Sequence, residues 1–243
     1  MLLRRIKSHI EKENWFAVFI DFCIVVLGLF MGLQANDWRQ ARLDNIAEVE
    51  LLERMHFDVE AASADLAAFA GFYRKRYSSL DSLEKLFFGE EILRPLSEKE
   101  CQLILSAHML RHPPAKLPTL TEVLLGGKLD LIRDEQLRRK IILLQQSNAN
   151  IRDHLDLLIS RNINFRSAYP GLMKGNPFRP VVSDDCDHTG MADSRAFLND
   201  LSGQLGRIKG FFNLIIKPME NDIQSLHDEL DNVVGWEHEE PKE

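Results

Sequence analysis

The apolar positions of the chain begin as one continuous run. The run covers residues 15–33, WFAVFIDFCIVVLGLFMGL, and contains a single charged residue, Asp21. A helix of that length spans roughly 28 Å at about 1.5 Å per residue, close to the hydrocarbon thickness of a bilayer. Trp15 and Trp38 bracket the run, and tryptophan is enriched at membrane–water interfaces. The pattern predicts a transmembrane helix over residues 15–35.

Two other interpretations of this run remain open. A cleaved signal peptide would be cut after Ala35, but bulky Leu33 then stands where small residues are preferred. The other interpretation is a buried helix of a globular protein.

Basic residues lie on both sides of the run, at Arg4, Arg5, Lys7 and Lys12 before it and at Arg39, Arg42 and Arg54 after it. The positive-inside rule therefore favours a cytoplasmic N-terminal segment, residues 1–14, and a location outside the cytoplasm for the domain after the span.

Small and polar residues share one face of the predicted span. They recur at helical spacing, at Ala17, Asp21, Gly28, Gly32 and Ala35. Gly28 and Gly32 form a GxxxG motif, which lets two helix backbones approach closely in lipid. A carboxylate such as that of Asp21 is costly in hydrocarbon and faces water or a partner. We expect either a helix–helix contact on this face or a simple reach of Asp21 to the near interface, with an ion path as a third alternative.

Beyond the span, apolar residues recur every three or four positions, which predicts long helices. The first helix extends through residues 36–88, the second starts at the N-cap Asp134, and the last covers residues 193–234 with a kink at Pro218. Their seams include Leu52, Met55, Val59, Leu66 and Tyr73; Leu137, Ile141, Leu144, Asn148, Leu155 and Asn162; and Leu201, Ile208, Ile215 and Leu226.

Two short helices are predicted between the first two long ones. Ser97-x-x-Glu100 and Thr119-x-x-Glu122 are typical of capping boxes, the first opening a helix to about Leu110. Gly126 and Gly127 end the second helix. The expected fold is all-α: one N-terminal transmembrane helix, then an antiparallel bundle of three long and about two short helices over residues 36–236, with a flexible tail at 237–243.

Composition narrows the function classes. Lys plus Arg total 30 against 37 Asp plus Glu, a net charge of −7, which is unfavourable for nucleic-acid binding. Three cysteines are too few for a disulfide scaffold or a four-cysteine zinc site. No hydrolase, metalloprotease, dinucleotide or phosphate-loop motif is present. We therefore predict a protein that is not an enzyme and carries no cofactor.

Two alternatives exist for the cysteines and histidines. Cys101, His108 and His112 are spaced to line one helix face, and residues 184–188 add further ligand types, but His112 precedes two prolines and the acidic loop is typical of a solvated turn. We expect no metal there. Outside the cytoplasm, Cys101 and Cys186 would be the only two thiols of the domain, and a disulfide between them would stabilise it by roughly 4 kcal/mol. Cys23 is expected to be a small apolar residue of the span.

Residues 4–42 resemble the opening of an uncharacterised family of bacterial single-span membrane proteins. The matching residues are Arg4-Arg5, His9, Asn14-Trp15, Ala17-Val18, Asp21-Phe22, Ile24-Val25-Val26, Gly28, Phe30, Gly32, Gln34 and Trp38-x-x-x-Arg42. A second similar stretch runs from Thr121 to Arg138. The resemblance implies an inner-membrane anchor and a helical domain, and it brings no known catalytic residues.

Together these features predict a non-enzymatic interaction or scaffold protein of the bacterial inner membrane. Its expected partners are the lipid bilayer and a membrane helix, from a second copy or another protein, and no nucleic acid. The alternative is an extracytoplasmic bundle that senses a ligand and signals through a membrane partner, because bundles bind ligands between facing helices.

Overall fold

The computed structural model describes residues 15–114, 116–174 and 180–235, without the side chains of residues 15–18 and 21. The described residues are helical apart from turns, loops and one isolated bridge between Met173 and Cys186, which confirms the all-α prediction. The chain divides into two compact units, residues 1–51 and residues 52–243.

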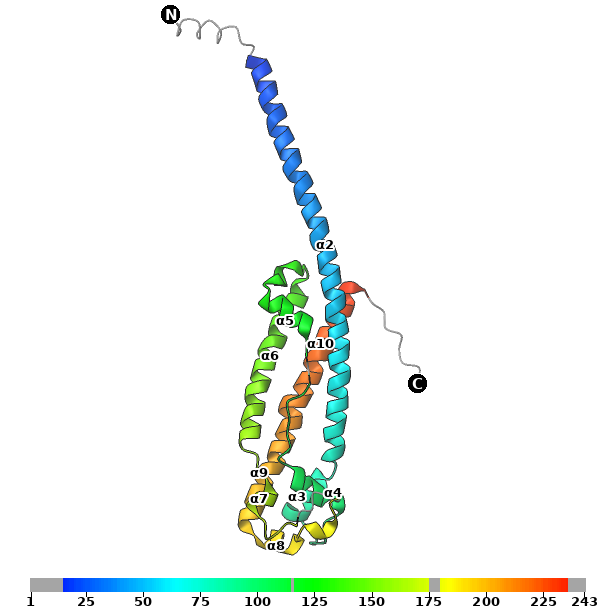
Figure 1. The fold of residues 1–243 in the computed structure, drawn as a ribbon, viewed down its shortest axis with the longest axis vertical. Helices are drawn as coiled ribbons and strands as arrows, with labels where there is room; N and C mark the ends of the chain where they lie inside the picture. The colour runs from blue at the N-terminus through cyan, green and yellow to red at the C-terminus, as the bar shows by residue number, and fades with distance from the viewer. Residues whose placement is uncertain (1–14, 115, 175–179, 236–243) are drawn as a thin grey trace, which may run out of the picture. The chain divides into compact units, whose positions relative to one another are not determined.

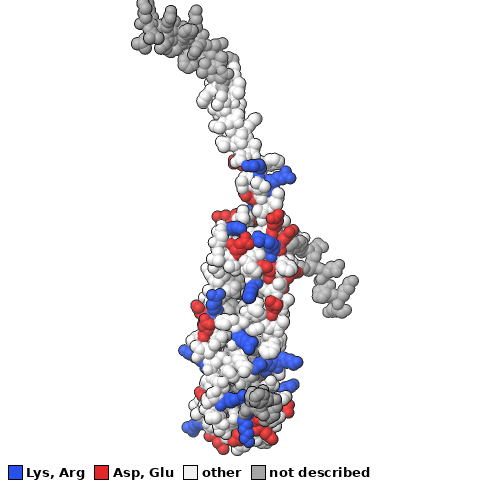
Figure 2. All heavy atoms as spheres, viewed as in Figure 1, with Lys and Arg blue, Asp and Glu red and all other residues white. Residues whose placement is uncertain are grey.

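The first unit is represented by the N-terminal part of α2, Trp15–Arg76, a continuous α-helix of 62 residues. Its apolar side chains are exposed, from Phe19 at 62% to Leu33 at 56%. Among the described residues, no helix combines the length and the apolar character needed to cross a membrane. Figure 2 shows the described start of α2 as a stretch without charged side chains, which is followed further along the helix by Arg, Asp and Glu.

The second unit is a helical bundle. It contains the C-terminal part of α2, then α6, Glu135–Ser160, and a final helical stretch made of α9, Arg195–Phe211, the π-helical turn η3, Phe212–Ile216, and α10, Lys217–Val234. In Figure 1, α10 runs antiparallel to α6 and to the second-unit part of α2. Ser147 bonds to Asp222, and Lys140 pairs with Glu229, which shows the antiparallel register of α6 and α10.

The predicted helix seams form the core of this bundle. The buried positions on the three long elements are Leu52, Met55, Val59, Ala62, Leu66 and Tyr73; Leu137, Ile141, Leu144, Ile151 and Leu155; and Leu201, Ile208, Phe211, Ile215, Met219, Ile223, Leu226 and Leu230. The Phe211 ring lies 5.1 Å from the Tyr73 ring and 6.3 Å from the Phe69 ring, so aromatic contacts join α2 to the final helical stretch.

Several predicted helix boundaries were wrong. The first long helix ends at Arg76, and a turn separates it from α3, Leu80–Phe88. The final stretch begins at Arg195 after the N-cap Ser194, close to the predicted start at about residue 193. The expected distortion near Pro218 takes the form of the π-helical turn that precedes it, because proline has no N–H to donate to the carbonyl of Leu214.

The short helices are more numerous than predicted and differ at their ends. They are α4, Glu98–Ser106; α5, Pro118–Leu125; α7, Phe165–Ala168; α8, His188–Asp193; and two 3₁₀ turns, η1, Lys128–Leu131, and η2, Ser183–Asp185. The capping box of Ser97 and Glu100 is present. The second predicted box is not, because α5 starts two residues earlier than that box requires, at Pro118, and the N–H of Thr119 donates to Asp58 instead.

Candidate functional site

The helix face on which Cys101, His108 and His112 would lie together does not form. α4 ends at Ser106, so both histidines lie in the segment that follows the helix. A hydrogen bond from the Tyr73 hydroxyl to the carbonyl of Met109 holds this segment against α2 instead. His112 pairs with Asp156 of α6 at 3.3 Å, with more than half of both side chains exposed. The three residues therefore do not constitute a metal site.

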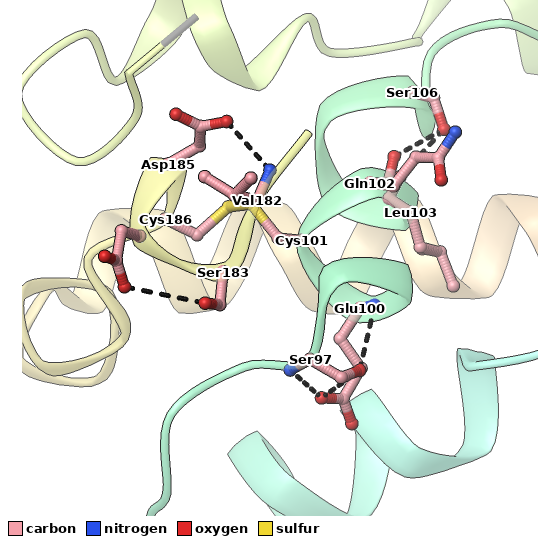
Figure 3. The surroundings of a disulfide bond; sticks show 11 residues. Ser97, Glu100, Cys101, Gln102, Leu103, Ser106, Val182, Ser183, Asp185 and Cys186 are labelled. Atoms are coloured by element: carbon pink, nitrogen blue, oxygen red, sulfur yellow. Dashed lines mark hydrogen bonds between the residues drawn. A yellow bond between two sulfur atoms is a disulfide. The ribbon is translucent and has the colours of Figure 1, made fainter. Parts of the chain in front are cut away.

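Cys101 is bonded to Cys186. Both residues are buried, and their Cα atoms are 5.8 Å apart, within the usual range for a disulfide. Figure 3 shows the bond joining the interior of α4 to the segment after η2. Backbone hydrogen bonds from Lys174 to Asp185 and from Asp187 to Leu172 fix the chain on either side of Cys186. Neither cysteine offers a thiol for catalysis or metal binding.

A buried carboxylate lies one residue from the disulfide. The Glu100 side chain is 2% exposed and accepts hydrogen bonds from the Arg94 guanidinium at 2.9 Å, from Ser82 and from the backbone N–H of Ser97 at 2.7 Å. The bonds from Arg94, more than those from the two serines, lower the pKa of Glu100 to about 2, against the opposing effect of burial. The site stabilises the start of α4 and holds no group poised for proton transfer near neutral pH.

The small-residue face of the predicted span is only partly described. Gly28 and Gly32 face open space, since a Cβ added at either would have no neighbour within 4 Å, and Ala35 is exposed. The side chains of Ala17 and Asp21 lie outside the described residues. Cys23 is a free cysteine of intermediate exposure.

A cluster of two histidines and two carboxylates, which the sequence analysis missed, lies between α2 and α10. His56 and Glu60 are one turn apart on α2, and His227 and Asp231 are one turn apart on α10. The imidazole rings of His56 and His227 stack with centroids 4.8 Å apart. One potential ligand atom each from His56, Glu60 and His227 lies within 4.8 Å of the other two. We call these four residues the histidine–carboxylate cluster.

Each half of this cluster can be recognised in the sequence from the spacing of its histidine and its carboxylate. His-x-x-x-Glu at 56–60 and His-x-x-x-Asp at 227–231 each place an imidazole and a carboxylate on one helix face. Such pairs are common on exposed helices. Only the packing of α2 against α10 shows that the two pairs meet.

The described surface pockets are shallow. One of about 300 Å³ is lined by Phe69, Phe72, Tyr73, Arg76, Met109 and Arg111. His108 lies next in sequence to Met109, and burial is the main cause that lowers its pKa, reinforced by the positive charges of Arg76 and Arg166. A second pocket, of about 390 Å³, lies between α6 and α10 and includes Lys140, Ser147 and Asp222. Neither brings together a nucleophile, a base and an oxyanion donor.

The chain matches no family model, and neither a curated protein nor a solved structure is detectably similar to it. The family resemblance of residues 4–42 therefore stays a prediction.

Proposed function

We propose that this chain is a membrane-anchored helical protein that acts through protein–protein contacts and not through catalysis. Residues 15–35 would anchor it in a bacterial inner membrane, with residues 1–14 in the cytoplasm. The bundle would be the interaction domain, in the periplasm. Lipid and a second membrane helix are the proposed partners of the N-terminal segment.

The observation that carries this proposal is the concentration of exposed large apolar side chains on α2. From Phe19 to Leu33 the large ones are between 41% and 69% exposed: Phe19, Ile20, Phe22, Ile24, Val25, Val26, Leu27, Leu29, Phe30, Met31 and Leu33. An apolar surface of this extent is unfavourable in water and marks contact with a membrane or another protein. The residues surround the helix instead of following one stripe, which favours lipid over a single protein groove.

The disulfide supports a location outside the cytoplasm. Disulfides persist in oxidising compartments such as the periplasm and are rare where thioredoxin and glutathione keep thiols reduced. The Cys101–Cys186 bond belongs to the unit after the apolar segment. An N-terminal segment in the cytoplasm and an oxidised bundle are consistent with one membrane crossing.

Reporter fusions test the anchor and its orientation together. The full chain should carry, at its C-terminus, either a reporter active only in the periplasm or one active only in the cytoplasm. We expect activity of the first reporter and recovery of the fusion in the membrane fraction after carbonate washing. A fusion that lacks residues 2–35 is the control and should lose both properties. Cytoplasmic activity, or a fully soluble intact fusion, would reject the proposal.

Cysteine crosslinking tests the contact made by the small-residue face. In a Cys23→Ser background, Gly28→Cys is compared with Phe30→Cys, which lies on the opposite side of the same helix. We expect mild oxidation in membranes to link the Gly28→Cys variant to a second copy at least five times more than the Phe30→Cys variant. Equal or absent linkage at both positions would contradict a specific contact on this face, and an adduct of other mass would identify a different protein as the neighbour.

A further inference from the structure

We propose that the histidine–carboxylate cluster binds one divalent transition-metal ion of the zinc class, which joins α2 to α10. The ion would be held by one imidazole nitrogen of His56, one of His227 and a carboxylate oxygen of Glu60. Asp231 would position the two imidazoles. This inference does not depend on the proposed membrane anchor.

The geometry of the cluster suits an ion of this size. Ligands bound at about 2.0–2.1 Å in a tetrahedral arrangement are about 3.3 Å from one another. Nδ1 of His56 lies 3.9 Å from Glu60 Oε2, and potential ligand atoms of His56, Glu60 and His227 are all within 4.8 Å of one another. Binding of a common ion would require side-chain rotations that shorten these separations by up to about 1.5 Å.

Asp231 has the position of an orienting carboxylate. Its Oδ1 lies 3.0 Å from Nε2 of His56, the nitrogen opposite the one nearer Glu60, and its Oδ2 lies 3.6 Å from Nδ1 of His227. Histidines that bind metals usually donate their other ring N–H to a carboxylate, which fixes the ring and increases the basicity of the bound nitrogen. One aspartate here faces both rings, so both imidazoles would be held by the same group.

The ligand atoms and the charge of the cluster favour one class of ion. Two nitrogen ligands with one oxygen ligand are typical of zinc and neighbouring transition metals, whereas Ca²⁺ and Mg²⁺ prefer oxygen ligands throughout. The carboxylates of Glu60 and Asp231 together balance the charge of a divalent cation. Burial falls from His56, whose side chain is 10% exposed, to Glu60 at 50%, so the cluster is open to solvent on the Glu60 side. Among the described residues the three ligands named here occupy three tetrahedral positions, and the fourth is left to water or to another donor.

The position of the cluster suggests what the ion would do. α2 contributes two of the four residues and is the helix that continues from the first unit into the bundle. α10 contributes the other two close to its end at Val234. A bound ion would therefore fix the first turns of α2 within the bundle to the last turns of α10, at a place where Met55 and Leu230 are already buried.

Calorimetric titration of the tag-free, metal-stripped full chain with ZnCl₂ tests the proposal. We expect one ion per chain with a dissociation constant below about 1 µM, and no heat of binding with MgCl₂ or CaCl₂. Replacement of zinc by Co²⁺ should give the visible absorption bands of a tetrahedral nitrogen–oxygen site. Absence of saturable zinc binding by the wild type would overturn the proposal.

Variants locate the site. Glu60→Gln and His227→Gln should each weaken zinc binding at least tenfold, and Asp231→Asn should weaken it by about 10- to 100-fold, as is usual for an orienting carboxylate. His112→Gln removes the exposed imidazole of the His112–Asp156 pair and is the matched control, which should bind as the wild type does. Glu60 is half exposed, so its variant keeps the fold and decides the outcome if His227→Gln unfolds. Unchanged binding by Glu60→Gln, or equal weakening by His112→Gln, would place the ion elsewhere and reject the assignment.

Discussion

Replacing Cys101 and Cys186 together by alanine is expected to lower the free energy of unfolding of the bundle by about 4 kcal/mol. The bond closes a loop of 85 positions, and in the chain-entropy model a loop of that length restricts the unfolded chain by about this amount. Both positions are buried, and alanine adds no polar group there. The difference is measured by urea unfolding of the full-length wild type and of the double variant, both in one detergent.

Reductant and thiol titration are the controls for this experiment. A reducing agent should destabilise the wild type to the level of the double variant and leave the double variant unchanged. Denatured wild-type chain should titrate one thiol, that of Cys23, before reduction and three after it. Three thiols without reduction, in protein isolated from membranes, would contradict the bond and remove the support that it lends to an exported bundle.

The long helices could be predicted because each carries its own signal. Leu137, Ile141 and Leu144 recur at the helical period, and Asp134 caps the same helix with a hydrogen bond to the N–H of Leu137. The end of α5 at Gly126 and Gly127 could also be predicted from local sequence, because Gly127 adopts a positive φ of 64°, which glycine tolerates best. Such features depend only on residues a few positions apart, so the sequence alone is enough to predict them.

The errors arose where distant residues decide the local structure. Residues beyond Ser106 leave the helix, and the hydroxyl of Tyr73 on α2 holds them through the carbonyl of Met109. Asn162, expected on the seam of a longer helix, lies past the end of α6, where it donates to the carbonyl of His108 and accepts from buried Gln204. Spacing along the chain holds no information about these partners.

The two clusters of candidate ligands also differ in whether local spacing or contacts between distant residues bring them together. The spacing of Cys101, His108 and His112 resembles a metal site only if one helix carries all three, and that helix ends too early. The histidine–carboxylate cluster is formed from two unremarkable i,i+4 pairs on helices that are far apart in sequence. The two pairs meet only because α2 packs against α10. That packing results from burial of the apolar seams of the two helices, and no local sequence motif encodes it.

Acid is expected to destabilise the bundle through Glu100. The pKa of this carboxyl is lowered to about 2, first by its hydrogen bonds to Arg94 and then by those from Ser82 and Ser97. A carboxyl with a lowered pKa in the folded state stabilises that state fully above its ordinary pKa, near 4.5. The stabilisation, about 2–3 kcal/mol, is therefore lost as the pH falls from about 5 to about 2.

The Glu100→Gln variant isolates this contribution. At pH 6 it should unfold about 2–3 kcal/mol more easily than the wild type, because the amide cannot pair with Arg94 and accepts fewer of the five donors that converge on the carboxylate. The difference should shrink steadily as urea unfolding is repeated at lower pH. Glu98→Gln, in the first turn of the same helix but exposed, is the matched control and should differ little from the wild type. A pH-independent difference between wild type and Glu100→Gln would mean that the loss comes from packing at α4, and that the Arg94–Glu100 charge pair contributes little to holding the chain beside the disulfide.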